Sequence, residues 1–196
     1  KQVILVDHNN SSQSVDGLDE AEILEIIDHH NIGNIITKKP INFRNSRTGS
    51  VSTIIYDMFK ESNVTVPKNI AGLLSSAIIS DTLLLTSPTT TQRDIDALKE
   101  LSTIAEIDYE KYGKELLIKG MSIKGLSAEA ILQKDFKTFK VNEDMFGIGQ
   151  ILTTDFSTIK KRMPEMVSYL NETAKKENYK ILCLFVTDIF DNVSYC

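Results

Sequence analysis

Three apolar segments of this sequence end in side chains that can bind a metal ion. The segments are VILVDH at residues 3–8, EIIDHH at residues 25–30 and AIISD at residues 77–81. All three histidines of the chain lie in the first two segments. Imidazole nitrogens combined with carboxylate oxygens suit manganese, iron, cobalt or zinc, and carboxylates that bridge two ions support phosphoryl chemistry. The residue types therefore predict a divalent-metal centre.

Parallel strands would bring these side chains into one crevice, because the carboxyl ends of the strands line the ligand site in an open α/β sheet. Neighbouring residues of an extended segment point to opposite faces, so only one of His29 and His30 can enter a given metal shell. We assign that position to His29 and a second role to His30. An Asp after a strand is alternatively a turn former or a helix N-cap. Three such endings together argue against this alternative. His8 is either an outer hydrogen-bonding group or a polar strand end.

The elements that would position these residues follow an α/β pattern. Short apolar runs rich in β-branched residues predict strands at VILVD, ILEIID and, after Pro40, INFR. Helical spacing of apolar residues predicts four helices, at about 50–61, after Pro67, at 91–105 and at about 109–117. Thr48 or Ser50 can cap the first helix. The second is apolar nearly all round, which predicts a buried helix with Asp81 at its end.

A glycine-containing segment separates two parts of the chain. Gly120 and Gly125 interrupt the regular pattern, so we predict an inter-domain linker at 119–128, between a first domain at 1–118 and a second at 129–196. The second part is predicted to contain a helix from Ala128, strands at TFKV, FGIGQIL and ILCLFVTDIF, and a long amphipathic helix at about 157–177. This pattern predicts a second α/β domain.

The composition indicates a soluble globular protein. The 196 residues are 41% hydrophobic, and the formal net charge of -5 argues against a nucleic-acid partner, whose phosphates attract a basic surface. No apolar stretch reaches the length of a membrane span. Cys183 and Cys196 lack the spacing of a secreted disulfide framework, so we expect a reducing cytoplasm. The chain begins without methionine on a strand-like segment, which we interpret as an internal start.

Five motifs together resemble one family. They are VDHN, DHH, R-x-x-x-x-G at Arg44 to Gly49, AIISDTLL followed by SPT, and D-x-K-x-F at Asp135 to Phe139. In this order and spacing they are similar to the manganese-dependent family II inorganic pyrophosphatases of the DHH phosphoesterase superfamily. The resemblance runs through essentially all of the chain. It implies a mostly parallel DHH-type sheet with flanking helices at 1–118, followed by part of a smaller α/β DHHA2-type domain at 129–196.

The resemblance also implies a reaction and a metal centre. The reaction is hydrolysis of pyrophosphate to two orthophosphates by a metal-activated water at two ions, which are manganese or cobalt, with magnesium as an additional ion on the substrate. Asp7 and Asp81 match the carboxylates that bridge the two ions, and His29 matches a ligand of one of them. Asp28 matches an outer partner that orients the ligands.

Further residues match groups that meet the substrate. His30 matches an imidazole close to the pyrophosphate, and with Asp28 it forms the predicted catalytic set. Lys137 matches the substrate-binding lysine of the second domain, and we expect Arg44 to lie near the substrate as well. Family members commonly pair through the first domain, so the resemblance implies a homodimer.

The sequence departs from the family pattern at both ends. It carries neither the N-terminal H-x-N-P-D-x-D motif, which completes the metal shells, nor the C-terminal S-R-K-K-Q type motif, which holds the pyrophosphate. We therefore expect the isolated chain to be nearly inactive. In some family members a nucleotide-binding CBS region precedes the VDHN strand, so such a region in the parent protein is one interpretation of this start.

Two alternative functions stay open. One is a DHH phosphodiesterase that cleaves short oligonucleotides or cyclic dinucleotides, although the glycine-rich G-G-G-H type motif of those relatives does not occur here. The other is a non-catalytic fragment that folds and binds one metal ion weakly.

Overall fold

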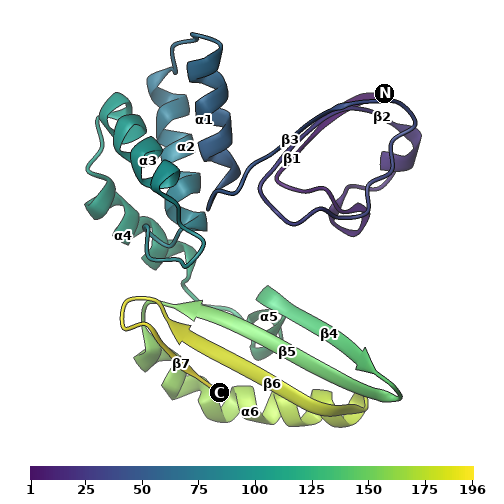
Figure 1. Ribbon diagram of the computed structural model, residues 1–196. Coiled ribbons are helices and arrows are strands. Elements are labelled where there is room, and N and C mark those ends of the chain that lie inside the picture. Colours follow the sequence, from purple (N-terminus) through teal and green to yellow (C-terminus); the bar gives the residue numbers. More distant parts are fainter. The chain divides into compact units, whose positions relative to one another are not determined.

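The structure, a computed structural model, describes residues 1–196 and divides them into two units, Lys1–Leu116 and Leu117–Cys196 (Figure 1). Each unit has its own sheet and its own helices, which confirms the predicted α/β class. The division lies inside helix α4 (Tyr109–Gly120). The segment 119–128, predicted as a linker, therefore includes the end of this helix.

Three parallel strands form the sheet of the first unit, in the order β1 (Gln2–Val6), β2 (Glu22–Asp28) and β3 (Asn42–Asn45). All three were predicted from their apolar, β-branched runs. Two short 3-10 turns, Ser11–Gln13 and Leu18–Glu20, lie between β1 and β2. Because the strands are parallel, their carboxyl ends meet at one edge of the sheet, and the VDHN and DHH motifs both lie at that edge.

Four helices complete the first unit: α1 (Val51–Glu61), α2 (Lys68–Asp81), α3 (Gln92–Ala105) and α4. These four helices confirm the prediction. Val51 and Ile54 of α1 pack on Ile27 of β2, which joins the helices to the sheet. Of the two predicted caps, Thr48 and Ser50, the structure shows Ser50, whose hydroxyl oxygen accepts a hydrogen bond from the Ser52 amide at 3.2 Å.

Helix α2 differs from the prediction of a helix buried nearly all round. Ala71, Ile78 and Ile79 are fully buried, but the side chain of Leu73 is 66% exposed. The reason is that α2 packs against α1 and α3, and these two helices cover only part of its surface. Asp81 is the last residue of α2, as the sequence predicted.

The second unit contains a four-stranded sheet in the order β4 (Phe136–Val141), β5 (Asp144–Thr153), β6 (Tyr179–Asp188) and β7 (Val193–Tyr195). Strands β5 and β6 are parallel and are connected by α6 (Phe156–Lys176), which lies along one face of the sheet (Figure 1). The other two pairings are antiparallel. A core of Ile131 from α5 (Ala128–Leu132), Ile159 from α6, Ile151 and Val186 holds this unit together. Among these strands only β7 was not predicted, because its three exposed residues carry no burial pattern.

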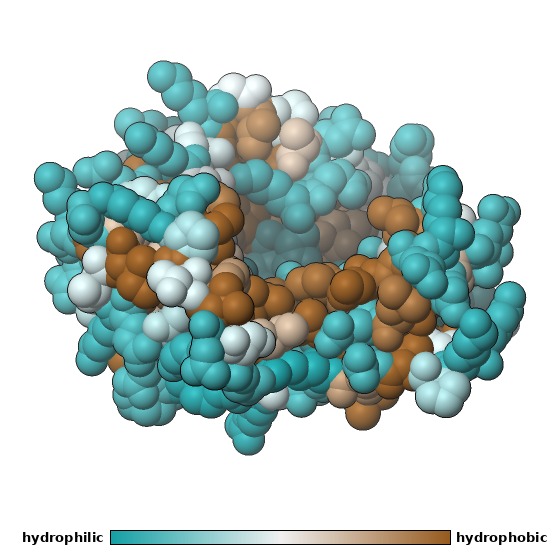
Figure 2. Space-filling view, turned by 90° about the horizontal axis from the view of Figure 1, so that it is seen from above, coloured by the Kyte–Doolittle hydropathy of each residue, from teal (hydrophilic) through white to brown (hydrophobic).

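Hydrophobic side chains also reach the surface, and Figure 2 shows them in areas that extend over several neighbouring residues. On the second sheet they include Phe139, Ile148 and Phe185, which the strand registers place on one face. That face is opposite the one that contributes Ile151 and Val186 to the core, since side chains alternate along a strand. No helix combines the length and the hydrophobicity that a membrane crossing requires.

Candidate metal centre

Asp7 and the two neighbouring histidines come together at the carboxyl ends of β1 and β2. Asp7 has a φ of 67°, and its amide donates a hydrogen bond to the carbonyl of Ile27 at 3.0 Å. This conformation turns the carboxylate toward the next strand. Its Oδ1 lies 3.1 Å from Nε2 of His29 and 4.0 Å from Nδ1 of His30. One ligand atom from each of the three residues lies within 4.8 Å of the others, close enough to surround one ion.

The imidazole of His29 is oriented by the segment before α1. Its Nδ1 lies 2.9 Å from the carbonyl oxygen of Thr48. Because a carbonyl can only accept, Nδ1 carries a proton, and Nε2, on the side of Asp7, is the ring nitrogen left for an ion. A carbonyl that fixes the tautomer of a ligand histidine is common behind metal sites. The donor set therefore fits a transition-metal ion such as manganese.

Asp28 lies behind this cluster with no exposed surface. Its Oδ1 accepts hydrogen bonds from the amide of His29 at 2.7 Å and from Nδ1 of His30 at 2.8 Å. Its Oδ2 accepts from the side-chain amide of Asn9. Burial alone would raise the pKa of Asp28, but the bonds from His30, Asn9 and two backbone amides outweigh it and hold the pKa below its ordinary value. Asp28 is thus an anion that fixes the ring of His30.

Asp81 reaches the same region from the end of α2. Its Oδ2 accepts a hydrogen bond from the hydroxyl of Ser50 at 2.6 Å. Desolvation by the surrounding protein raises the pKa of Asp81, and the charge of Asp7 adds to the rise, while the Ser50 hydroxyl and the imidazoles of His29 and His30 oppose it. Asp81 does not belong to the close group of Asp7, His29 and His30. A cation between Asp7 and Asp81 would favour the ionised form of both carboxylates.

An unusual turn follows Asp81 and fixes the end of α2. Three consecutive leucines, Leu83, Leu84 and Leu85, have φ angles of 49°, 55° and 67°. Residues with a Cβ atom rarely adopt this left-handed conformation, which costs about 1–2 kcal/mol per residue. Hydrogen bonds hold the turn, among them the amide of Leu84 to the carbonyl of Ile79 at 2.8 Å. Backbone strain of this kind is typical of functional sites.

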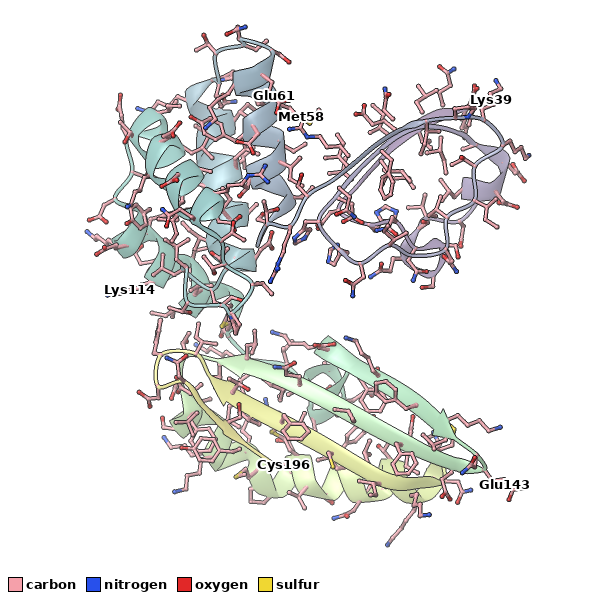
Figure 3. The ribbon with its side chains drawn as sticks, viewed as in Figure 1. Lys39, Met58, Glu61, Lys114, Glu143 and Cys196 are labelled. Atoms are coloured by element: carbon pink, nitrogen blue, oxygen red, sulfur yellow. The ribbon has the colours of Figure 1, made fainter.

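The remaining candidate residues make contacts of other kinds. The guanidinium of Arg44 donates two hydrogen bonds, of 2.5 and 2.6 Å, to Glu61. Glu61 is labelled in Figure 3, at the end of α1. Lys137 is an exposed residue of β4 in the second unit, 3.9 Å from Asp135. Nδ1 of His8 lies 3.0 Å from the carbonyl of Val6, and its Nε2 is buried without a partner.

Sequence reasoning missed the contacts of four residues around the cluster. Asn9 stands in the VDHN motif, but its bond to Asp28 joins residues 19 positions apart. Thr48 acts through its backbone carbonyl, which any residue type provides. Ser50 was predicted only as a helix cap, and Asp94 only as part of the helix at 91–105. The sequence signal that could have indicated these contacts is Gly49, because a glycine lets the backbone approach a neighbouring element closely.

Two family models match the chain. The model of the DHH family, N-terminal domain, matches residues 1–78, and the model of the DHHA2 domain matches residues 114–196. The chain is 46% identical over 189 residues to a probable manganese-dependent inorganic pyrophosphatase of Clostridium acetobutylicum, covering 96% of this chain and 61% of the relative. It is 41% identical over 192 residues to the manganese-dependent inorganic pyrophosphatase of Bacillus subtilis, covering 98% and 62%.

A solved structure shares the fold. The crystal structure of a protein from Methanococcus jannaschii, assigned as a family II inorganic pyrophosphatase, matches with a TM-score of 0.78 and 37% identity. The match covers 96% of this chain and 64% of that one, so the chain spans somewhat less than two thirds of its relatives' length. Matches that run through both units, together with the order of the motifs, show that the chain belongs to the DHH–DHHA2 family of manganese-dependent inorganic pyrophosphatases.

Proposed function

We propose that this protein hydrolyses inorganic pyrophosphate to two orthophosphates, with manganese bound by Asp7, His29 and Asp81. The observation that carries the proposal is the close approach of two of these ligands, with Oδ1 of Asp7 3.1 Å from Nε2 of His29. The hydrogen bond from His29 to Thr48 supports it, because it leaves the second ring nitrogen available to an ion. The names of the relatives supply the substrate class.

The roles of the side chains follow from their contacts. Bound manganese or cobalt, with magnesium on the substrate, would neutralise the phosphates and make a water more acidic. Asp7 and Asp81 offer anionic oxygens to the cations, and His29 offers a neutral nitrogen. His30 donates from Nδ1 to the buried carboxylate of Asp28, so its Nε2 is free to exchange a proton with the substrate.

Lys137 and Arg44 are proposed as cations that contact phosphate oxygens. Lys137 has an exposed ammonium group, whereas Arg44 is held by Glu61 through two hydrogen bonds. Arg44 can reach an anion only when this pair opens. Glu61→Gln should therefore strengthen the binding of pyrophosphate if Arg44 takes part, and should have no effect on it otherwise.

The test compares the release of orthophosphate from pyrophosphate with the cleavage of a linear dinucleotide, both with manganese. The proposal predicts orthophosphate from pyrophosphate and an intact dinucleotide. Cleavage of the dinucleotide without hydrolysis of pyrophosphate would overturn it in favour of a phosphodiesterase. If neither substrate is cleaved, even after addition of a polypeptide that carries an H-x-N-P-D-x-D motif, a protein without catalytic activity is favoured.

The assay conditions matter because the 196 residues supply few predicted metal ligands. Asp7, His29 and Asp81 are three ligands for a centre of two ions, so we expect the 196-residue chain alone to turn over slowly. Each missing contact that stabilises charge can cost on the order of a hundredfold in rate. The assay should therefore be repeated after addition of a polypeptide that carries an H-x-N-P-D-x-D motif. Turnover by the chain alone at about 10 per second or more would contradict the ligand assignment.

We also propose a cytoplasmic location and self-association. Two free cysteines support the location, because such thiols persist in a reducing compartment. The unpaired edge of β1, where Ile4 and Val6 are exposed, supports the pairing of two copies. Light scattering over a wide range of concentrations tests the pairing, and a clean monomer throughout would contradict it.

A further inference from the structure

The carboxylate of Asp94 joins three elements near the metal centre. Oδ2 accepts hydrogen bonds from the amide of Gly49 at 2.8 Å and from the amide and hydroxyl of Thr91 at 2.8 and 2.6 Å. Oδ1 accepts from the hydroxyl of Thr53 in α1 at 2.6 Å. Asp94 has no exposed surface. A buried carboxylate with four donors is a strong and directional anchor.

Helix capping explains only half of these bonds. Thr91 and Asp94 form the capping box of α3, in which each side chain bonds the backbone of the other residue. That function needs no contact outside α3. The bonds to Gly49 and Thr53 reach 45 and 41 residues along the chain, to the segment that precedes α1 and to α1 itself. They tie the beginning of α3 to residues 48–50 and to α1.

Residues 48–50 in turn hold two predicted metal ligands. The carbonyl of Thr48 accepts from Nδ1 of His29, and the hydroxyl of Ser50 donates to Asp81. Gly49, between them, donates to Asp94. Three consecutive residues therefore connect one buried carboxylate to a histidine at the end of β2 and to an aspartate at the end of α2.

The packing around Gly49 is close on the sides of α2 and α3. A Cβ atom there would lie 2.8 Å from Cγ2 of Thr82, 3.1 Å from Oδ2 of Asp94 and 3.3 Å from the carbonyl of Thr89. Thr82 directly follows Asp81. The segment therefore lies between the end of α2 and the beginning of α3, and Asp94 contacts it from the side of α3.

We propose that Asp94 is a positioning residue of the metal centre, which acts through the Thr48–Gly49–Ser50 segment on the orientation of His29 and Asp81. This inference deepens the proposed function, since it assumes that these two residues bind manganese. It assigns no contact between Asp94 and an ion or substrate. Asp94 pre-orients ligand side chains that would otherwise rotate freely. Groups behind a metal site typically change the metal affinity by about 10–100-fold.

The test uses Asp94→Ala and Asp94→Asn, with two measurements. Nitrogen-15 NMR of the metal-free protein reports which ring nitrogen of His29 carries the proton, and calorimetry reports the Kd for manganese. Asp94→Ala should lower the fraction of the Nδ1-protonated form of His29 and raise the Kd at least about tenfold. In Asp94→Asn the side-chain oxygen can still accept from Gly49 while the amino group donates to the Thr53 hydroxyl, so both quantities should stay within about twofold of wild type.

A matched control separates positioning from stability. Ala97→Gly changes a buried residue of α3 that takes part in none of these bonds, and it should raise the equilibrium constant of unfolding about fivefold through helix propensity. Its Kd for manganese should be unchanged. If Asp94→Ala behaves like this control, with lower stability but an unchanged Kd and tautomer, Asp94 is only a helix cap and the proposal is overturned.

Failure of Asp94→Ala to fold and absence of manganese binding by the wild type each have their own test. If Asp94→Ala does not fold, Thr53→Val removes one donor to Asp94 at nearly constant volume, and an unchanged Kd and tautomer in that folded variant would equally overturn the proposal. If the wild-type protein binds no manganese, the proposed metal centre fails. The tautomer of His29 in the metal-free variants still decides whether Asp94 positions the ring.

Discussion

The replacement Gly49→Ala tests how tightly the segment behind the metal centre is packed. The added methyl group would meet Cγ2 of Thr82 at 2.8 Å, whereas ordinary contacts begin at 3.4 Å, so one of the two elements must move by the difference of about 0.6 Å. Overpacking of this kind costs about 1–3 kcal/mol. The lower entropy of the unfolded chain with alanine returns about 0.4–1 kcal/mol. We expect a net loss of roughly 1–2 kcal/mol, which is about 5–30-fold in the equilibrium constant of unfolding.

Urea unfolding followed by circular dichroism measures this loss, and Gly72→Ala is the matched control. An added methyl at Gly72, inside α2, would lie 3.9 Å from Cβ of Ala105, which is an ordinary contact. The control should therefore gain about 0.5–1 kcal/mol from its helix position. Gly49→Ala should also raise the Kd for manganese, because the carbonyl of Thr48 and the hydroxyl of Ser50 move with the segment. Equal stability of the two variants would refute the packing argument, and an unchanged Kd in Gly49→Ala would refute the connection to the ligands.

Three further variants test other parts of the structure. Ser50→Ala removes both the cap of α1 and the hydrogen bond to Asp81, so it should lower the free energy of unfolding by about 0.5–2 kcal/mol and weaken manganese binding. Urea unfolding and calorimetry measure the two effects, and an unchanged Kd for manganese would contradict the role of Ser50 at Asp81. Hydrogen bonds from Ser157, then from Thr158, lower the pKa of Asp155 to about 2, so its stabilisation of α6 should be present above about pH 4 and be lost as the pH falls through 2. The unfolding midpoints of wild type and Asp155→Ala should therefore converge at low pH, and a constant difference between the two midpoints at every pH would contradict this. Ile159→Ala empties a fully buried position and should cost the second unit about 2–5 kcal/mol, measured by hydrogen exchange, with amides of the first unit as the internal reference.

The regular elements of this protein could be predicted because local patterns determine them. Apolar residues at helical spacing predicted α1 to α4 and α6, and β-branched runs predicted β1, β2 and the long strands of the second unit. The three-residue strand β7 has no such pattern. The left-handed turn at Leu83 to Leu85 could not be predicted either, because leucine has no preference for positive φ and the turn is held by its tertiary surroundings.

The candidate site divides in the same way. Asp7, Asp28, His29 and His30 were identified because their residue types follow predicted strands, so their chemistry and their place could both be inferred. Asp94 carries the same chemistry, but it lies in an amphipathic helix where a carboxylate usually faces water. Its bond to Gly49 spans 45 residues, and only the tertiary structure brings the two together. The carbonyl of Thr48 gives no sequence signal at all, since every residue has one.

Pulsed electron paramagnetic resonance of bound manganese tests most directly whether His29 is a ligand. With all three histidines labelled with nitrogen-15, the account predicts a hyperfine coupling from one directly bound ring nitrogen. The coupling should disappear in His29→Gln and persist in His8→Gln and His30→Gln, which keep the other histidines as controls. If the coupling persists in His29→Gln, or if it disappears in His30→Gln instead, the assignment of Asp7, His29 and Asp81 as the metal centre is contradicted.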